Sequence, residues 1–246
     1  MTHNRGIYIQ IDGIDGAGKS TAREATRAWF GERGMTVFDT VSYARAHHTL
    51  PSLADAGTAQ VLFTGEPSCG WTGAAIRDEI IRSSTPYSAK LTAQAYALDR
   101  AVQHVRLTRP FLSGGPNRWV IQDRGFFSSL AYQTLQSIRN GEADPVTPEW
   151  LLSLEGNRVT FDRPPDAFLF LDVAPDVAQK RLAGHEDNHR FEGESFQTAV
   201  AERYRDPALR AFLEKMGTRF VTVDASQNTD AVAADIRTLL EEVAAS

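Results

Sequence analysis

A single motif near the N-terminus constrains the fold of this chain more than any other feature of its sequence. The pattern G-x-x-x-x-G-K-[ST] is matched in full by Gly13, Ile14, Asp15, Gly16, Ala17, Gly18, Lys19 and Ser20. It follows an apolar, β-like run at residues 7–12 and precedes a stretch of helical periodicity at residues 21–30. The motif requires such a strand–loop–helix setting, so the sequence predicts a loop whose backbone N–H groups surround phosphate oxygens.

Residues 13–20, together with Thr21 in the following helix, form the predicted ATP-binding site. The helix N-terminus places a partial positive charge beside the phosphates. We expect the Lys19 ammonium to reach the β and γ phosphates and the Ser20 hydroxyl to ligate Mg²⁺, the predicted cofactor. The motif by itself allows ATP or GTP, but the Asn-Lys-x-Asp segment of guanine-specific switch proteins does not occur in the sequence.

The rest of the chain alternates short β-like runs with longer helical stretches. Several runs are apolar on both faces, as strands buried in a parallel sheet are, and they lie at residues 7–11, 36–38, 60–63, 119–121, 167–171 and 220–223. This alternation predicts a parallel sheet with helices on both faces. No linker-like segment divides the chain, so we expect one α/β domain over residues 1–246, with an excursion at about 42–59 between two β-like runs.

The predicted helix at residues 88–107 carries two distinct faces. We expect its apolar stripe to face the core, and the stripe consists of Leu91, Ala95, Leu98, Val102 and Val105. A neighbouring face with i, i+4 and i+7 spacing consists of Tyr96, Arg100 and Gln103.

Composition excludes several classes of function. The formal net charge is −5, which argues against a protein that coats nucleic acid, because bulk attraction to phosphate backbones needs a positive excess. No apolar stretch approaches the length of a membrane span, and the first five residues do not resemble a signal peptide. The single cysteine, Cys69, fits a reducing compartment. We therefore expect a cytoplasmic protein that binds neither nucleic acid nor membrane.

Further motifs follow the phosphate-binding loop in order, and together they resemble the thymidylate kinase family over nearly the whole chain. They are Glu66-Pro67, residues 73–77, residues 97–100, Asp123-Arg124, residues 128–133, residues 165–173 and residues 190–196. The resemblance implies a P-loop kinase fold with a five-stranded parallel sheet. It implies transfer of the γ phosphate of ATP to a deoxypyrimidine monophosphate, dTMP, which yields dTDP. It also implies a homodimer whose interface is an apolar helix face.

The chemistry of such a transfer can be argued from the reactants. A phosphate monoester has a second pKa of about 6, so the acceptor is already an anion at pH 7 and needs no general base. The obstacle is charge repulsion, which Lys, Arg and Mg²⁺ must offset together. Asp123 and Arg124 follow a β-like run, at the edge where α/β sheets bind ligands. We expect Asp123 to hold Mg²⁺ through water and Arg124 to bind the acceptor phosphate; a purely structural ion pair is the alternative.

The resemblance implies roles for further side chains on the acceptor side. Tyr96 would stack on the pyrimidine, and Arg100, one helical turn later, would donate a hydrogen bond to its C4 carbonyl. Ser129 would face the base, and Tyr132 would crowd the ribose 2′ position and favour deoxyribose. Asp15 would lie near the sugar and the metal, and Glu66 and Arg77 would contribute to binding the acceptor.

A segment at about residues 180–192 resembles the lid of the family. This chain has Gly16 where one subtype carries a catalytic arginine, and the bacterial-type subtype supplies arginines from the lid instead. Arg181 and Arg190 match those positions and would neutralise charge during transfer. A solvated, basic helix end is the alternative. Residues 225–227 match the segment that contacts adenine in the family.

Three departures from the family pattern concern the acceptor side. Gly125 follows Asp123-Arg124, where the family often has an aromatic residue or a histidine. Gly65 precedes Glu66-Pro67, where the family often has an arginine that binds the acceptor phosphate. Arg77, in the next motif, or Arg124 could take its place. The excursion at 42–59 has no counterpart in shorter members.

These departures leave other functions open. One is a kinase for another deoxypyrimidine monophosphate, such as dUMP or a 5-modified dUMP. Another is a kinase for a deoxynucleoside, and a third is a nucleotide-binding regulator that transfers nothing.

Overall fold

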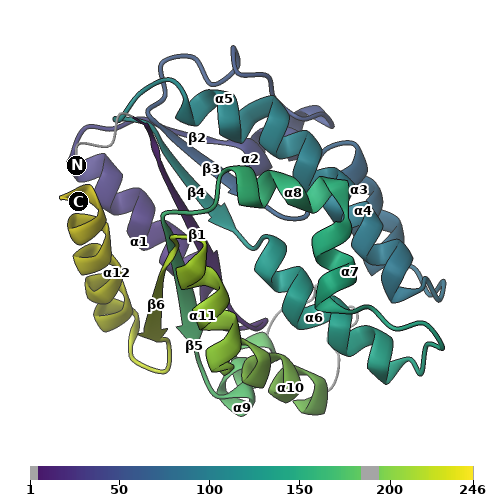
Figure 1. Cartoon of the computed structure of the whole chain (residues 1–246). Helices are drawn as coiled ribbons and strands as arrows, with labels where there is room; N and C mark the ends of the chain where they lie inside the picture. The colour runs from purple at the N-terminus through teal and green to yellow at the C-terminus, as the bar shows by residue number, and fades with distance from the viewer. Residues whose placement is uncertain (1–4, 184–193, 246) are drawn as a thin grey trace.

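Six parallel strands form the central sheet of residues 5–183 and 194–245, the part of the chain that this computed structural model describes. Their order across the sheet is β2-β3-β4-β1-β5-β6 (Figure 1). Their bounds are β1 (Ile7–Asp12), β2 (Val37–Asp39), β3 (Val61–Gly65), β4 (Trp119–Asp123), β5 (Ala167–Asp172) and β6 (Arg219–Asp224). The predicted parallel α/β fold is confirmed. The predicted count of five strands is wrong by one, because β2 pairs with the edge of β3.

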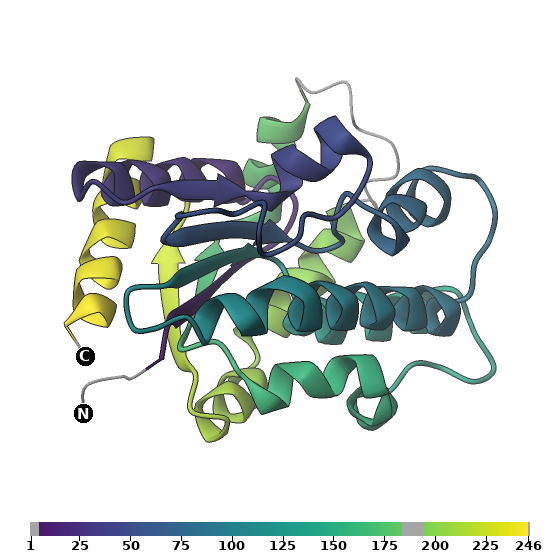
Figure 2. The same cartoon turned by 90° about the horizontal axis from the view of Figure 1, so that it is seen from above.

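Helices connect the strands and cover both faces of the sheet. Figure 2 shows α1 on one side of the sheet, and α4 with α8 on the other. Their bounds are α1 (Lys19–Glu32), α2 (Thr40–His47), α3 (Thr72–Ala75), the π-helical η1 (Ile76–Ile81), α4 (Ala89–Gln103), the π-helical η2 (His104–Thr108), α5 (Arg109–Leu112), α6 (Phe126–Arg139), α7 (Pro148–Ser153), α8 (Glu155–Asp162), α9 (Pro175–Leu182), α10 (Glu194–Arg205), α11 (Pro207–Lys215) and α12 (Thr229–Ala244).

Alternate residues of each strand point to opposite faces of the sheet. Because helices cover both faces, side chains on both sides are buried. On the α1 side, Phe30 packs edge-on against Trp119, with ring centroids 5.3 Å apart. On the other side, Leu62 and Val120 join an apolar cluster with Phe111 of α5. Burial on both faces explains why the β-like runs of the sequence are apolar throughout rather than alternating.

The apolar stripe of α4 does not face the core, contrary to the prediction. Leu91 and Leu98 of α4 are 47% and 55% exposed, and Val105, which follows in η2, is 60% exposed. The buried face carries small and polar side chains instead, among them Ala89, Ala93, Ala97, Asp99 and Arg100. The small residues allow close packing, since a Cβ added at Gly156 of α8 would lie 2.2 Å from the carbonyl oxygen of Ala97. Large apolar residues would hold these backbones apart, so the hydrophobic period of α4 marks its outer face.

The excursion at residues 42–59 is fixed to the body of the molecule. It begins within α2, and the Thr40 hydroxyl at the start of that helix donates to the carbonyl oxygen of Phe63 in β3, at 3.0 Å. Further along, Leu50 is buried, and Arg106 Nε donates to the carbonyl oxygen of Pro51 at 2.9 Å. As a result α2 lies beside the carboxyl end of β3.

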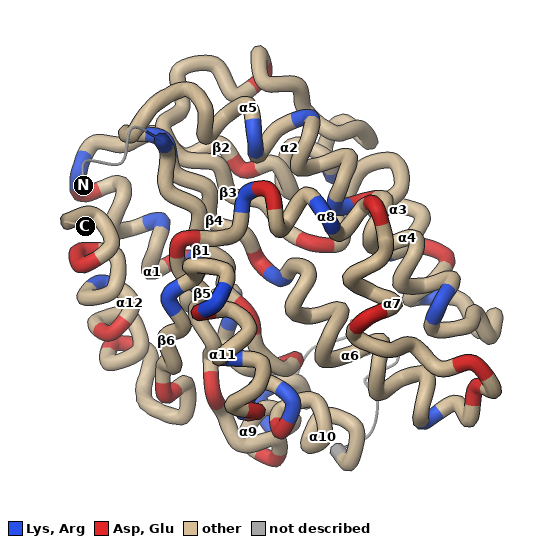
Figure 3. The backbone as a smooth tube through the Cα atoms, viewed as in Figure 1, with Lys and Arg blue, Asp and Glu red and all other residues tan. Residues whose placement is uncertain are grey.

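Two further expectations concern the chain as a whole. Within the described ranges, no helix has the length and apolar character needed to cross a membrane. Figure 3 shows Lys and Arg interspersed with Asp and Glu over the fold, in keeping with the small net charge.

The predicted lid starts in α9, but residues 184–193, including Arg190, lie outside the described residues. The single-domain organisation and the lid stay predictions.

Candidate active site

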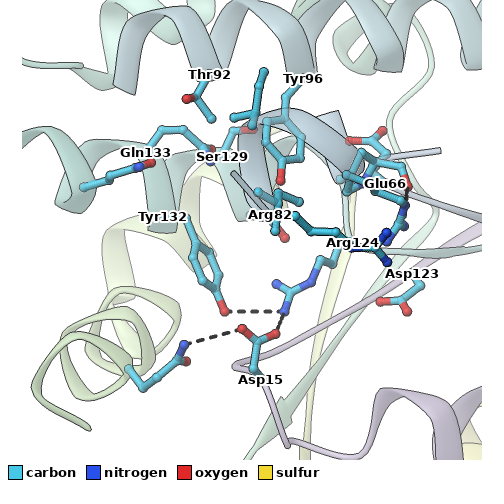
Figure 4. A pocket seen from close by; sticks show the side chains of 18 of the residues that line it. Asp15, Glu66, Arg82, Thr92, Tyr96, Asp123, Arg124, Ser129, Tyr132 and Gln133 are labelled. Carbon is cyan, nitrogen blue, oxygen red and sulfur yellow. Dashed lines mark hydrogen bonds and ion pairs between the residues drawn. The ribbon is translucent and has the colours of Figure 1, made fainter. Parts of the chain in front are cut away.

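A cavity of about 480 Å³ lies at the carboxyl ends of β3 and β4, between the phosphate-binding loop and helices α4 and α6 (Figure 4). Most residues predicted for the acceptor side line it together, namely Asp15, Glu66, Arg77, Tyr96, Asp123, Arg124, Ser129 and Tyr132. They come from elements far apart in sequence, and the parallel sheet brings them together because the carboxyl ends of its strands meet at one edge.

The phosphate-binding loop joins β1 to α1 in the predicted strand–loop–helix arrangement. Gly16 has a φ of +79°, and a Cβ there would lie 2.3 Å from the carbonyl oxygen of Ala178 in α9, so only glycine fits. Lys19 Nζ donates to the carbonyl oxygens of Gly13 and Ile14, at 3.2 and 2.9 Å. Burial lowers the pKa of Lys19. A buried ammonium held over the loop is placed to meet an anion there.

Arg124 connects the loop to the cavity. Its backbone φ is 63°, in the left-handed region that non-glycine residues rarely adopt. Its guanidinium forms an ion pair with Asp15 and lies over the ring of Tyr132, 5.0 Å from the centroid. Figure 4 shows this chain of contacts, from the Tyr132 hydroxyl through Arg124 to Asp15. Burial alone would raise the pKa of Asp15, but the Arg124 and Lys19 cations hold it below its usual range.

Arg100 is buried behind the cavity and does not line it. Its Nε donates to Glu66 Oε2 at 2.9 Å, and its Nη2 donates to Ser129 Oγ at 3.1 Å. Asn157 of α8 accepts a further hydrogen bond from the same guanidinium. Burial raises the pKa of Glu66 to about 7 in spite of this cation. Arg100 therefore positions two side chains that do line the cavity, and its direct contact with a base stays a prediction.

Two polar side chains that the sequence analysis missed lie near Tyr96. Thr92 Oγ1 and Gln133 Oε1 are buried in the cavity wall without a hydrogen-bond partner among the described residues. Figure 4 places both on α4 and α6, beside Tyr96 and Ser129. Leaving such an atom unpaired costs about 1–3 kcal/mol, so a ligand that pairs with it is favoured. The sequence spacing could have identified Thr92, because it lies one helical turn before Tyr96 and therefore on the same face of the helix.

The remaining predicted side chains have contacts of their own. Arg77 Nε donates to the carbonyl oxygens of Pro67 and Ser68, both at 3.1 Å, so this guanidinium shapes the wall of the cavity. Arg181 Nη2 donates to the carbonyl oxygen of Ala225 at 2.9 Å. That bond ties α9 to the segment predicted to contact adenine.

The carboxylate of Asp123 fits a magnesium site. Its Oδ1 is buried and has no hydrogen-bond partner among the described residues, although it lies in a polar cavity. Ser20 lies in the first turn of α1, with its residue exposed to solvent. Mg²⁺ is commonly bound by one or two carboxylates together with substrate phosphates and water, so a larger cluster of protein ligands is not required.

Comparison with known proteins agrees with this geometry. A sequence model described as thymidylate kinase matches residues 46–236. A thymidylate kinase of Bifidobacterium longum strain NCC 2705 is 31% identical over 244 residues, which cover 97% of this chain and 99% of that protein. A probable thymidylate kinase of Natronomonas pharaonis is 30% identical over 226 residues, covering 92% and 93% of the two chains. The resemblance is thereby confirmed, and the chain belongs to the thymidylate kinase family of nucleoside-monophosphate kinases.

Proposed function

We propose that this chain transfers the γ phosphate of ATP to dTMP and so produces dTDP and ADP. One observation carries the proposal: a single cavity joins a wall suited to a base, at Tyr96 and Gln133, to a cationic wall at Arg124 beside the phosphate-binding loop. The names of the Bifidobacterium and Natronomonas relatives support the same activity.

At the base end, the two unpaired polar atoms suit a pyrimidine. The thymine ring offers one N–H donor between two carbonyl acceptors. Gln133 Oε1 can accept from that N–H, and the Thr92 hydroxyl can donate to a carbonyl, while the Tyr96 ring provides a face for stacking. Ser129 would face the same ring, and Tyr132 would lie against the sugar and disfavour a 2′-hydroxyl.

At the phosphate end, the acceptor dianion needs cations rather than a base. Arg124 would bind its phosphate, held in place by the ion pair with Asp15. Lys19 would exchange the carbonyl oxygens of Gly13 and Ile14 for phosphate oxygens of ATP. Arg181 would add positive charge from α9, beside the loop, and Arg190 would add more from the lid.

Ser20 and Asp123 would hold Mg²⁺, Asp123 through water. When bound, the ion would neutralise charge on the β and γ phosphate oxygens. The unpaired Oδ1 of Asp123 supports this assignment.

We also propose a homodimer formed through the outer face of α4. The apolar stripe has alternating spacings of four and three residues, as helices that pair side by side have. Leu91, Leu98 and Val105 of the stripe are exposed, Ala95 and Val102 between them are half-buried, and Val105 lies at the start of η2. A cytoplasmic location is supported by the single cysteine, Cys69.

A coupled assay of ADP release tests the activity across dTMP, dUMP, 5-modified dUMP, dCMP and thymidine. We expect turnover to be fastest with dTMP. Faster turnover with another monophosphate would show that this nucleotide, and not dTMP, is the preferred acceptor. Turnover with thymidine alone would indicate a nucleoside kinase. ATP binding without ADP release on any acceptor would indicate a regulator.

A further inference from the structure

Four arginines line the cavity, and three of them are engaged with the protein. Arg124 is paired with Asp15, Arg77 donates to backbone carbonyls, and Arg82 pairs with Asp78 at 2.8 Å. The side chain of the fourth, Arg45, forms no hydrogen bond or ion pair with any residue that the structure describes.

The charge balance of the cavity makes this unpaired cation significant. Three carboxylates also line it, and of these Glu66 is already paired with the buried Arg100, while Asp15 and Asp123 face the phosphate end. A phosphate monoester brings about two negative charges, which would be strongly unfavourable beside these groups without an available cation. Arg124 is already partly neutralised by Asp15, so a second contact from Arg45 would offset more of the phosphate charge.

Arg45 belongs to α2, the helix at the start of the excursion, and the structure holds this helix firmly. Asp39 caps it by accepting hydrogen bonds from the backbone N–H groups of Val41 and Ser42, at 3.0 and 3.1 Å. The same carboxylate pairs with Arg23 of α1 at 2.7 Å. The position of Arg45 is therefore set by contacts that lie outside the cavity.

Gly65, at the carboxyl end of β3, lies within contact distance of α2. A Cβ added at Gly65 would lie 3.4 Å from Val41 Cγ2 and 3.7 Å from the carbonyl oxygen of Asp123. A long side chain at position 65 would therefore compete with α2 for space. Arg45 lies four residues after Val41, on the same helix face, which turns it toward the end of β4 that carries Asp123 and Arg124.

We propose that Arg45 binds the 5′-phosphate of the acceptor nucleotide, together with Arg124. The excursion thus supplies from α2 a cation that the glycine at position 65 cannot supply. The inference rests on the proposed function, because it assigns a residue to the acceptor-phosphate end of that site.

Calorimetric titration of the whole chain with dTMP and with thymidine, which differ only by the phosphate, tests the assignment. For Arg45→Ala we expect the Kd of dTMP to rise about tenfold, and for Arg45→Glu to rise further, since a charge-assisted contact is lost and then reversed. Thymidine and ATP should bind both variants as they bind the unaltered protein. Arg158→Ala removes another exposed cation, on α8 outside the cavity, and should change none of these affinities.

An unchanged Kd of dTMP in Arg45→Ala would overturn the assignment, and so would an equal loss for thymidine, which would indicate damage to the pocket. The result is separable from the activity itself. If the unaltered chain prefers another monophosphate, the same comparison is made with that nucleotide and its nucleoside. A loss confined to the monophosphate would then support the role of Arg45 while the proposal of dTMP as substrate fails.

Discussion

Arg124 shows how much of the site depends on one residue and its neighbours. The sequence placed it at the end of a strand, but not its pairing with Asp15, because 109 residues separate the two. Its left-handed backbone is followed by Gly125, where a Cβ would lie 2.6 Å from Gln10 Oε1. A side chain at position 125 would therefore displace Gln10. The sequence alone does not give this steric reason for the glycine, because only the fold brings Gly125 next to Gln10.

Gln133 carries a prediction about the base. In Gln133→Leu, which keeps the approximate size of the side chain, we expect the KM for dTMP to rise about tenfold while the KM for ATP is unchanged, because only the acceptor of the base N–H is lost. Steady-state kinetics with each substrate varied in turn measures this. Gln94→Leu, at an exposed position of α4, is the control. Equal changes in both constants would contradict the placement of the base.

The buried pair of Arg100 and Glu66 makes a prediction about pH. Burial raises the pKa of Glu66 from 4.5 to about 7, so the folded protein binds this proton more tightly than the unfolded chain does. The stabilisation that this proton provides is present at low pH and is lost as the pH rises through about 7. Arg100→Ala removes the cation, so we expect the free energy of unfolding to fall by about 3–5 kcal/mol at pH 8, and by less at pH 5.

Urea unfolding at pH 5, 6, 7 and 8 measures this effect. Adding Glu66→Gln to Arg100→Ala removes the buried charge, so the double variant should recover stability at pH 8 and lose the added dependence on pH. Identical pH profiles for the single and double variants would show that Glu66 is not the group responsible.

At the scale of elements, α2 depends on its cap. Asp39→Ala removes two hydrogen bonds to the helix N-terminus, and we expect the free energy of unfolding to fall by about 1–2 kcal/mol. Asp39→Asn keeps a capping oxygen and should lose less. Urea unfolding of both variants decides the matter, and equal losses would mean that the ion pairs of Asp39 with Arg23 and Arg27, rather than the cap, stabilise this region.

Helix α4 shows where reasoning from periodicity ends. The helix itself and the shared face of Tyr96 and Arg100 were predictable from spacing. Which face is buried was not, because α4 packs through Ala93 and Ala97 against close backbones and buries the charged Arg100 in a hydrogen-bonded network. The spacing of apolar residues identifies the apolar face of a helix, but it does not say what packs against that face. In α4 no described part of this chain packs over Leu91 and Leu98.

At the scale of the whole molecule, the sequence was sufficient to predict the type of fold but not the full number of strands. The strand–loop–helix motif and the alternation of runs were enough for the parallel fold, since such strands need helices on both faces. Residues 36–38 were among the β-like runs, but the count of five strands came from the family resemblance, so the additional edge strand β2 was left out of the count. The cation that the excursion places in the cavity was missed as well.

The exposed stripe of α4 carries a prediction about assembly. Leu98→Glu places a charge at the centre of the proposed interface, and we expect it to convert the dimer to a monomer in sedimentation velocity experiments while the thermal unfolding of each chain stays cooperative. Arg158→Glu, on the exposed surface of α8, should leave the dimer intact. A monomeric unaltered protein, or a dimer that survives Leu98→Glu, would contradict this interface.

The central claim is that one cavity holds the thymine ring and the phosphate of dTMP at opposite ends. The most direct measurement is a crystal structure of the chain with dTMP and a non-hydrolysable ATP analogue. We predict that the ring stacks on Tyr96 within hydrogen-bonding reach of Gln133, and that the 5′-phosphate contacts Arg124 and points toward the loop at Lys19. A ring bound away from Tyr96, or an Arg124 side chain turned out to solvent, would contradict the account.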